Sequence, residues 1–222
     1  FSGATAGELH FSGATPELGE LNLTTTGAFD VKTAMDINAL VISTGTLATS
    51  EEVTFGSISN MGTISLGADA AVDGLFASSS DDAVLAVGAH TFTFGGQITF
   101  IDNTYITAGA TSSLIFNGTD AYVLPANITS LNDLTINRSG GVSMSGNLDV
   151  KGSLTLTSGD FNIGDGHNLT INKALGGSIA NLKSVATSSL VVKGTTAVSL
   201  PALDLATLDI NNSNTTTLTG AV

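Results

Sequence analysis

The chain has 222 residues, of which 42% are hydrophobic and only 11% are charged, and its formal net charge at pH 7 is −13. Soluble globular proteins usually carry about 25% charged residues, so most of the polar surface here must come from Thr, Ser, Asn and Gly. Six basic residues cannot form the cationic face that nucleic-acid binding needs, and the absence of cysteine excludes disulfides and thiolate metal sites.

The first part of the chain contains a short duplication and apolar segments of uneven spacing. The pentapeptide "FSGAT" occurs at Phe1 and again at Phe11. Further on, the triplets "ISL" at Ile64 and "LAV" at Leu85 lie 21 residues apart, but the other apolar segments of residues 38–89 follow this spacing less closely. We therefore expect irregular coils or a loop within residues 38–89.

From Phe92 onwards, apolar triplets recur at a nearly constant distance. "FTF" at Phe92, "LIF" at Leu114 and "LTI" at Leu134 are separated by 22 and then 20 residues. A fixed period of this size is typical of proteins that are built from stacked repeats.

Between residues 134 and 172 the apolar triplets follow one another closely, and each of the first three has a counterpart three triplets further along the chain. The triplets begin at Leu134, Val142, Leu148, Leu154, Phe161 and Leu169. Corresponding members lie 20, 19 and 21 residues apart. The first and third residues of a strand triplet point to one side, so each triplet has an apolar side for a core and a polar side for solvent.

This repeat predicts the fold. Strands of three residues cannot form a stable hairpin sheet by themselves, but they can if each turn of the chain stacks in parallel on the one before. We predict an all-β, single-stranded parallel β-helix (a solenoid) with about 20 residues per coil, as a single domain over residues 1–222. The residues expected to point inward are Leu134, Ile136, Leu154, Leu156, Leu169, Ile171, Leu190 and Val192.

An antiparallel sandwich or barrel is the alternative fold. The pairs Asn117-Gly118 and Asp165-Gly166 would suit the hairpin turns of such a fold. In the solenoid, segments such as "SGG" at Ser139, "KGS" at Lys151 and "SGD" at Ser158 become corners instead. We expect Gly, Asn or Asp to take the left-handed backbone conformation at these corners.

The pattern continues to the last residues. "LVV" at Leu190 follows Leu169 by 21 residues, and "SSLIFNGT" at Ser112 is echoed by "SSLVVKGT" at Ser188. No amphipathic helix or charged run closes either end, whereas natural solenoids usually cover their terminal coils with polar caps. We therefore expect both ends to be interfaces, either with adjoining repeats of a longer polypeptide or with identical subunits end to end.

Two polar segments are candidates for chemistry. In "GDGHNLT", Asp165 and His167 would form a carboxylate–imidazole pair or, alternatively, an ordinary polar corner. Asp160, Asn162 and Asp165 are candidate calcium ligands, although their spacing lacks the alternation of acidic calcium loops. We expect a polar corner and no metal.

The adjacent carboxylates Asp81 and Asp82 resemble the aspartate pair of polygalacturonase-type β-helix hydrolases. Those enzymes also carry His and an Arg-x-Lys group, but the sole arginine of this chain, Arg138, lies more than 50 residues away. Pectate-lyase-like β-helices need an arginine base and a calcium-binding acidic cluster, which are also missing. We therefore expect no catalytic residues and no cofactor.

The segment "SLNDLTINRSGGVSMSGNLDVKGSLTLTSGDFNIGDGHNLTIN" resembles the repeat regions of very large secreted and cell-surface proteins of Bacteroidetes-type bacteria, which are often exported by the type IX route. It is also similar to the β-helix shafts of filamentous-haemagglutinin-like adhesins and autotransporter passengers. The likeness is clearest over residues 114–172 and implies an extracellular or cell-surface location in a bacterium.

We expect a structural or adhesive β-helix rod without catalysis, as a segment of a surface adhesin or a subunit of a head-to-tail fibre. Surface polysaccharide is a further candidate partner. Membrane insertion is not expected, because the apolar runs fall well short of about 18 residues. The alternative is a β-helix that binds or cleaves polysaccharide. A third possibility is ice or mineral-surface binding through outward rows of threonine such as Thr135, Thr155 and Thr170.

Overall fold

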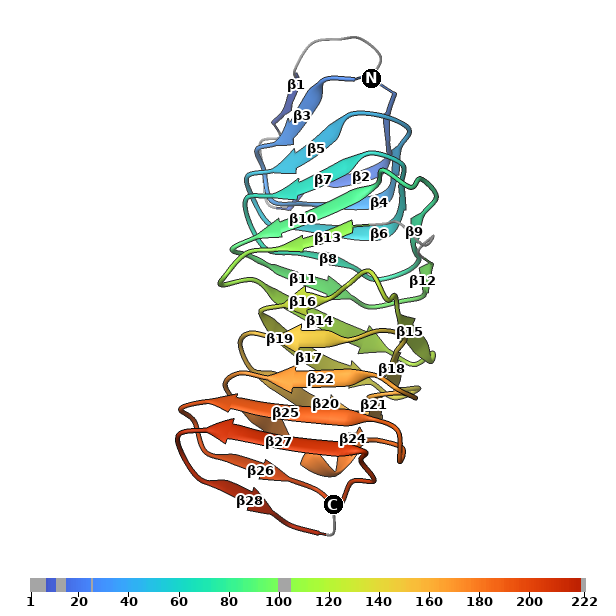
Figure 1. The fold of residues 1–222 in the computed structure, drawn as a ribbon. Coiled ribbons are helices and arrows are strands. Elements are labelled where there is room, and N and C mark those ends of the chain that lie inside the picture. The colour runs from blue at the N-terminus through green and yellow to red at the C-terminus, as the bar shows by residue number, and fades with distance from the viewer. Residues whose placement is uncertain (1–6, 11–14, 25, 100–104, 221–222) are drawn as a thin grey trace. The chain divides into compact units, whose positions relative to one another are not determined.

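The computed structural model describes residues 7–10, 15–24, 26–99 and 105–220. The "FSGAT" segments that begin at Phe1 and Phe11 lie almost entirely outside these ranges. Within the described residues the secondary structure consists of strands β1 to β28 and one short 3-10 turn, η1 (Ile179–Asn181) (Figure 1). The chain groups into two compact units, Phe1–Ser112 and Ser113–Val222, and each is a parallel β-solenoid. The predicted fold class is therefore confirmed.

The first sheet of unit 1 runs along one side of its solenoid in the order β1-β3-β5-β7-β10-β13. These strands are β1 (Gly7–Leu9), β3 (Ala28–Val31), β5 (Thr46–Thr49), β7 (Thr63–Leu66), β10 (Val84–Gly88) and β13 (Tyr105–Ala108). Phe29, Leu47, Ile64 and Leu85 are register partners on successive strands and form one buried column. The parallel register places each apolar side chain on the one in the coil before.

The other strands of unit 1 form its second surface. They are β2 (Glu17–Leu23), β4 (Met35–Ile42), β6 (Val53–Asn60), β8 (Ala70–Val72), β9 (Phe76–Ser78), β11 (Thr91–Phe94) and β12 (Ile98–Thr99). The long strand β6 pairs with β8 along its first part and with β9 along its second part. The rings of Phe76, Phe92 and Phe94 pack edge to face in the core, with centroids 4.8–5.9 Å apart.

Residues 38–89 consist of coils of unequal length. Leu47 pairs with Ile64 after 17 residues, whereas Ile64 pairs with Leu85 after 21 residues. The eight-residue strands β4 and β6 also run past the point at which later coils place a corner. Both features make the repeat harder to recognise in the sequence, although β4, β5 and β6 pair with their neighbours in parallel.

Unit 2 has three short strands per coil, as the triplets predict. The first sheet contains β14 (Ser113–Gly118), β17 (Asp133–Arg138), β20 (Leu154–Ser158) and β23 (Leu175–Gly177). The second contains β15 (Tyr122–Leu124), β18 (Val142–Met144), β21 (Phe161–Asn162) and β24 (Leu182–Lys183). The third contains β16 (Ser130–Leu131), β19 (Leu148–Val150), β22 (Asn168–Ile171), β25 (Ser189–Gly194) and β27 (Thr207–Asn212), and β26 (Val198–Leu200) pairs separately with β28 (Thr216–Leu218).

The predicted register of unit 2 is confirmed. Leu134 pairs with Leu154, Val142 with Phe161 and Leu148 with Leu169, all in parallel. All eight side chains that were predicted to point inward are 0–1% exposed. The antiparallel alternative is wrong for these strands, because Asn117-Gly118 lies inside the parallel β14·β17 ladder and Asp165-Gly166 connects strands of two different sheets.

Glycine takes the left-handed conformation at two of the three corners named above, at Gly141 and Gly159, but Gly152 of the "KGS" corner does not. Among the described residues only glycines have positive φ, so the expectation that Asn or Asp would share this role is wrong there. At Gly159, with φ +73°, an added Cβ would lie 1.8 Å from the carbonyl oxygen of Arg138. Close stacking of one coil on the next leaves no room for a side chain at this corner.

Candidate functional site

The pair Asp165 and His167 lies at the corner between β21 and β22, but the two side chains do not form a unit. The Asp165 carboxylate accepts a hydrogen bond from the Thr187 hydroxyl of the next coil. The backbone N–H of Gly166 donates to the same hydroxyl at 3.3 Å. His167 instead accepts a backbone bond from Ser189 at 2.8 Å. This corner therefore connects neighbouring coils.

The three calcium candidates are directed to three different partners. Asp160 faces the Lys183 ammonium at 3.7 Å, and the Asn162 amide donates to the Ser143 hydroxyl at 3.4 Å. The Asp165 carboxylate accepts the hydrogen bond from the Thr187 hydroxyl. Over the part of the chain that the structure describes, no three Asp, Glu, His or Cys side chains gather as a metal site would require.

Asp81 and Asp82 lie in an exposed turn between β9 and β10. The backbone N–H of Asp82 donates to the Ser80 hydroxyl at 3.3 Å, which forms a local turn contact. Among the described residues, no Lys, Arg or His side chain forms an ion pair with Asp81 or Asp82.

The outward threonine rows are mixed. Thr135 and Thr155 are register partners, but the same row continues to Ile115 on one side and Gly176 on the other. In unit 1, Thr46 and Thr63 are followed by Val84. These rows combine hydroxyl, aliphatic and glycine positions, so the Thr-x-Thr regularity of an ice-binding face is not present in them.

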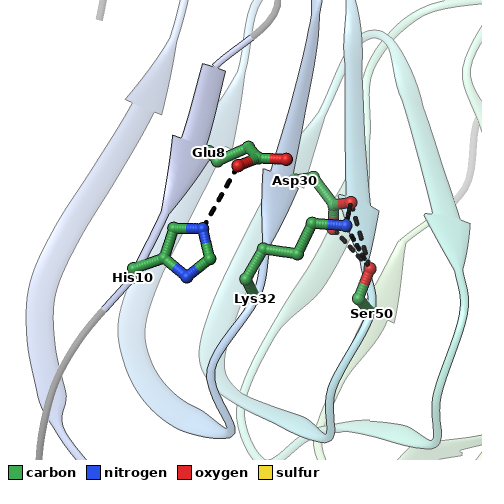
Figure 2. A network of polar contacts seen from close by, with 5 residues as sticks. All are labelled: Glu8, His10, Asp30, Lys32 and Ser50. Carbon is green, nitrogen blue, oxygen red and sulfur yellow. Dashed lines mark hydrogen bonds and ion pairs between the residues drawn. The ribbon is translucent and has the colours of Figure 1, made fainter.

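A polar network that sequence reasoning missed connects the first coils of unit 1 (Figure 2). Lys32 forms an ion pair with Asp30 at 2.5 Å and donates to the Ser50 hydroxyl at 3.0 Å. Ser50 in turn donates to the Asp30 carboxylate at 3.0 Å, and His10 contacts Glu8 at 3.2 Å. The signal for this network was the spacing of "ELH" and "FDVK", which places the paired residues on the same side of their strands.

A serine beside a lysine and an aspartate raises the question of nucleophilic catalysis. A lysine that activates serine must be neutral in order to accept the hydroxyl proton. The hydrogen bond with Asp30 raises the pKa of Lys32; partial desolvation opposes this effect, and the charges of Asp30 and Glu8 add to it. Lys32 therefore stays protonated, and the chemistry that this arrangement supports is the joining of successive coils by charge-assisted hydrogen bonds.

The outer surface of β2, β4 and β6 in unit 1 carries a groove. Its volume is about 500 Å³ and its lining is mostly polar. The lining residues are Glu17, Asp36, Ile37, Asn38, Thr54, Gly56 and Asp73. An added Cβ on Gly56 would lie 2.4 Å from the Asn38 carbonyl oxygen, so the floor of the groove has no side chain at this position. The residues meet because β2 and β4 pair with a shift of 19 residues, which places Glu17 beside Asp36.

This groove is rich in hydrogen-bond acceptors. The Asn38 amide donates to the Glu17 carboxylate at 2.9 Å, which orients one wall. Three carboxylates, a threonine hydroxyl and an amide surround the groove, and no basic residue lines it. Such a lining can accept hydrogen bonds from ligand hydroxyl or amino groups. Sequence reasoning missed it because residues from coils of unequal length form it.

The sole arginine is buried and serves the fold of unit 2. Arg138 is 1% exposed, and its guanidinium donates to the carbonyl oxygens of Asp120 and Asn117 in the preceding coil. Desolvation lowers the pKa of Arg138 and raises that of the neighbouring Tyr122. An arginine nevertheless stays charged, so Arg138 acts as a charged clamp on the turn between β14 and β15.

The chain matches no family of known proteins, no curated protein and no solved structure. The described residues contain no helical segment with the length and hydropathy of a membrane span.

Proposed function

We propose that this chain is a structural or adhesive β-helix rod segment of an extracellular or cell-surface bacterial protein, and that it does not catalyse a reaction. The observation that carries this proposal is that polar side chains of the chain form bonds between neighbouring coils. The Asp30–Lys32–Ser50 network, the Asp165–Thr187 contact and the buried Arg138 all connect one coil with the next. Side chains that hold coils together are suited to a scaffold.

The finer part of this proposal concerns the class of protein. The resemblance of residues 114–172 to repeat regions of large secreted adhesins supports it, as does the low charge of the chain. Outward amide and hydroxyl side chains stack on their counterparts, as in the Asn137–Asn117 bond of 3.1 Å and the Asn162–Ser143 bond of 3.4 Å. Such ladders provide a hydrophilic surface with few charges, which suits a long repetitive shaft.

The proposed partners are coils that stack end to end on this segment. In the C-terminal coil, Ile210 and Leu218 are 44% and 47% exposed, whereas their register partners Val192 and Leu200 are fully buried. Leu208 lies on the same side and is half-buried. This apolar face lacks the lysines and prolines with which natural proteins protect exposed strand edges. It supports a contact with adjoining repeats or with a second subunit.

The test is the association state of residues 1–222 against concentration, followed by light scattering. We expect oligomers that grow with concentration and that disappear in Ile210→Lys and Leu218→Lys. The matched control is Val123→Lys, which changes a valine that is 57% exposed in the middle of β15, away from this face. A chain that stays monomeric at high concentration, or oligomers that survive both end variants, would contradict an end-to-end contact between copies of this chain.

The groove of unit 1 favours a second candidate function, the binding of a polysaccharide. Its volume of about 500 Å³ lies in the range of ligand sites, and its acceptors suit sugar hydroxyl or amino groups. Calorimetry with neutral and amino-sugar oligosaccharides tests this candidate. Glu17→Gln and Asp73→Asn should each weaken binding at least about tenfold, which corresponds to the loss of a hydrogen bond to a charged group, while the exposed-turn control Asp81→Asn should bind normally. Absence of binding by the unaltered chain would reject the candidate.

A further inference from the structure

No further inference is drawn: the strongest candidate, the open apolar face that Leu208, Ile210 and Leu218 form on the C-terminal coil, belongs to the end-to-end interface already proposed, and nothing in the structure shows what covers it.

Discussion

At the scale of single residues, Arg138 shows how a charged side chain can belong to the core of a solenoid. Leu134, Ile136 and Arg138 occupy alternate inward positions of the same strand, so the guanidinium follows the path of the aliphatic column. There it meets two carbonyl oxygens of the preceding coil instead of water. A buried guanidinium without hydrogen-bond acceptors is costly, and these two carbonyl oxygens supply acceptors for it.

Replacement of Arg138 by methionine should therefore destabilise the protein. The substitution keeps an unbranched side chain but removes the two hydrogen bonds from the guanidinium to the carbonyls of Asn117 and Asp120, and we expect a loss of about 3 kcal/mol. Urea unfolding measures the change. Lys193→Met, at an exposed position, is the control and should stay within about 0.5 kcal/mol of the unaltered chain. A loss below about 1 kcal/mol for Arg138→Met would show that the clamp is unimportant.

The Lys32 network predicts a pH dependence with a defined sign. The pKa of Lys32 is raised in the folded state above its ordinary value of 10.5. A raised lysine pKa contributes stability that is fully present below the unfolded pKa and is lost as the pH rises through the folded pKa. Thermal midpoints of the unaltered chain and Lys32→Gln should therefore differ at pH 8 and converge as the pH rises past the ordinary lysine pKa of 10.5. The difference should be small, because the pair is solvent-accessible.

The comparison with Lys32→Gln separates this effect from general alkaline unfolding. Added salt should also reduce the difference at pH 8, since screening weakens exposed ion pairs. The control is Lys193→Gln, which removes an exposed lysine that has no ion-pair partner among the described residues. A gap between the unaltered chain and Lys32→Gln that stays constant from pH 8 to pH 12 would argue against a role for the ion pair.

At the scale of strands and corners, two glycines with nearly the same φ angle allow two costs of a side chain to be measured separately: the strain of a left-handed backbone and the steric clash with the neighbouring coil. Gly159 and Gly166 have φ of +73° and +69°. An added Cβ at Gly159 would overlap the Arg138 carbonyl, whereas at Gly166 nothing lies within 4 Å. Gly166→Ala should cost about 1 kcal/mol from the left-handed backbone alone. Gly159→Ala should cost clearly more, because the coils must also move apart.

Thermal or urea unfolding of the two variants measures this difference. Equal losses would mean that the coil spacing at Gly159 relaxes easily, and would contradict the view that close stacking selects glycine there.

The sequence predicts some elements of this protein well and others poorly, for physical reasons. In unit 2 the register of Leu134, Val142 and Leu148 with later triplets was predictable, because each strand is a separate triplet and each coil buries it in the same way. In unit 1 the neighbours of Glu17 and Asp36 were not predictable. Their coils differ in length, and the groove depends on which outward side chains become neighbours, a property that hydrophobic spacing does not constrain.

At the scale of the whole molecule, stability in a solenoid comes from contacts between neighbouring coils, so a coil with one neighbour is less stable than a coil with two. In unit 2, β17 lies between its paired strands β14 and β20, and β20 lies between β17 and β23. β27 pairs with β25, and no further partner of β27 is found among the described residues. Hydrogen exchange at low concentration should therefore be slow in β17 and β20 and fastest in β27 and β28.

Hydrogen exchange also connects this local stability with the proposed end-to-end contact. If another coil stacks on the face of Ile210 and Leu218, the edge amides of β27 gain acceptors and the two side chains lose contact with water. Raising the protein concentration should then slow exchange in β27 and β28 while β17 and β20 stay unchanged. In Ile210→Lys, exchange in β27 should be fast at every concentration, because the ammonium would have to be buried in the contact. If β27 in the unaltered chain exchanges at the same rate across all concentrations, its edge is not an interface between copies of this chain, and its partner must be sought in another polypeptide segment.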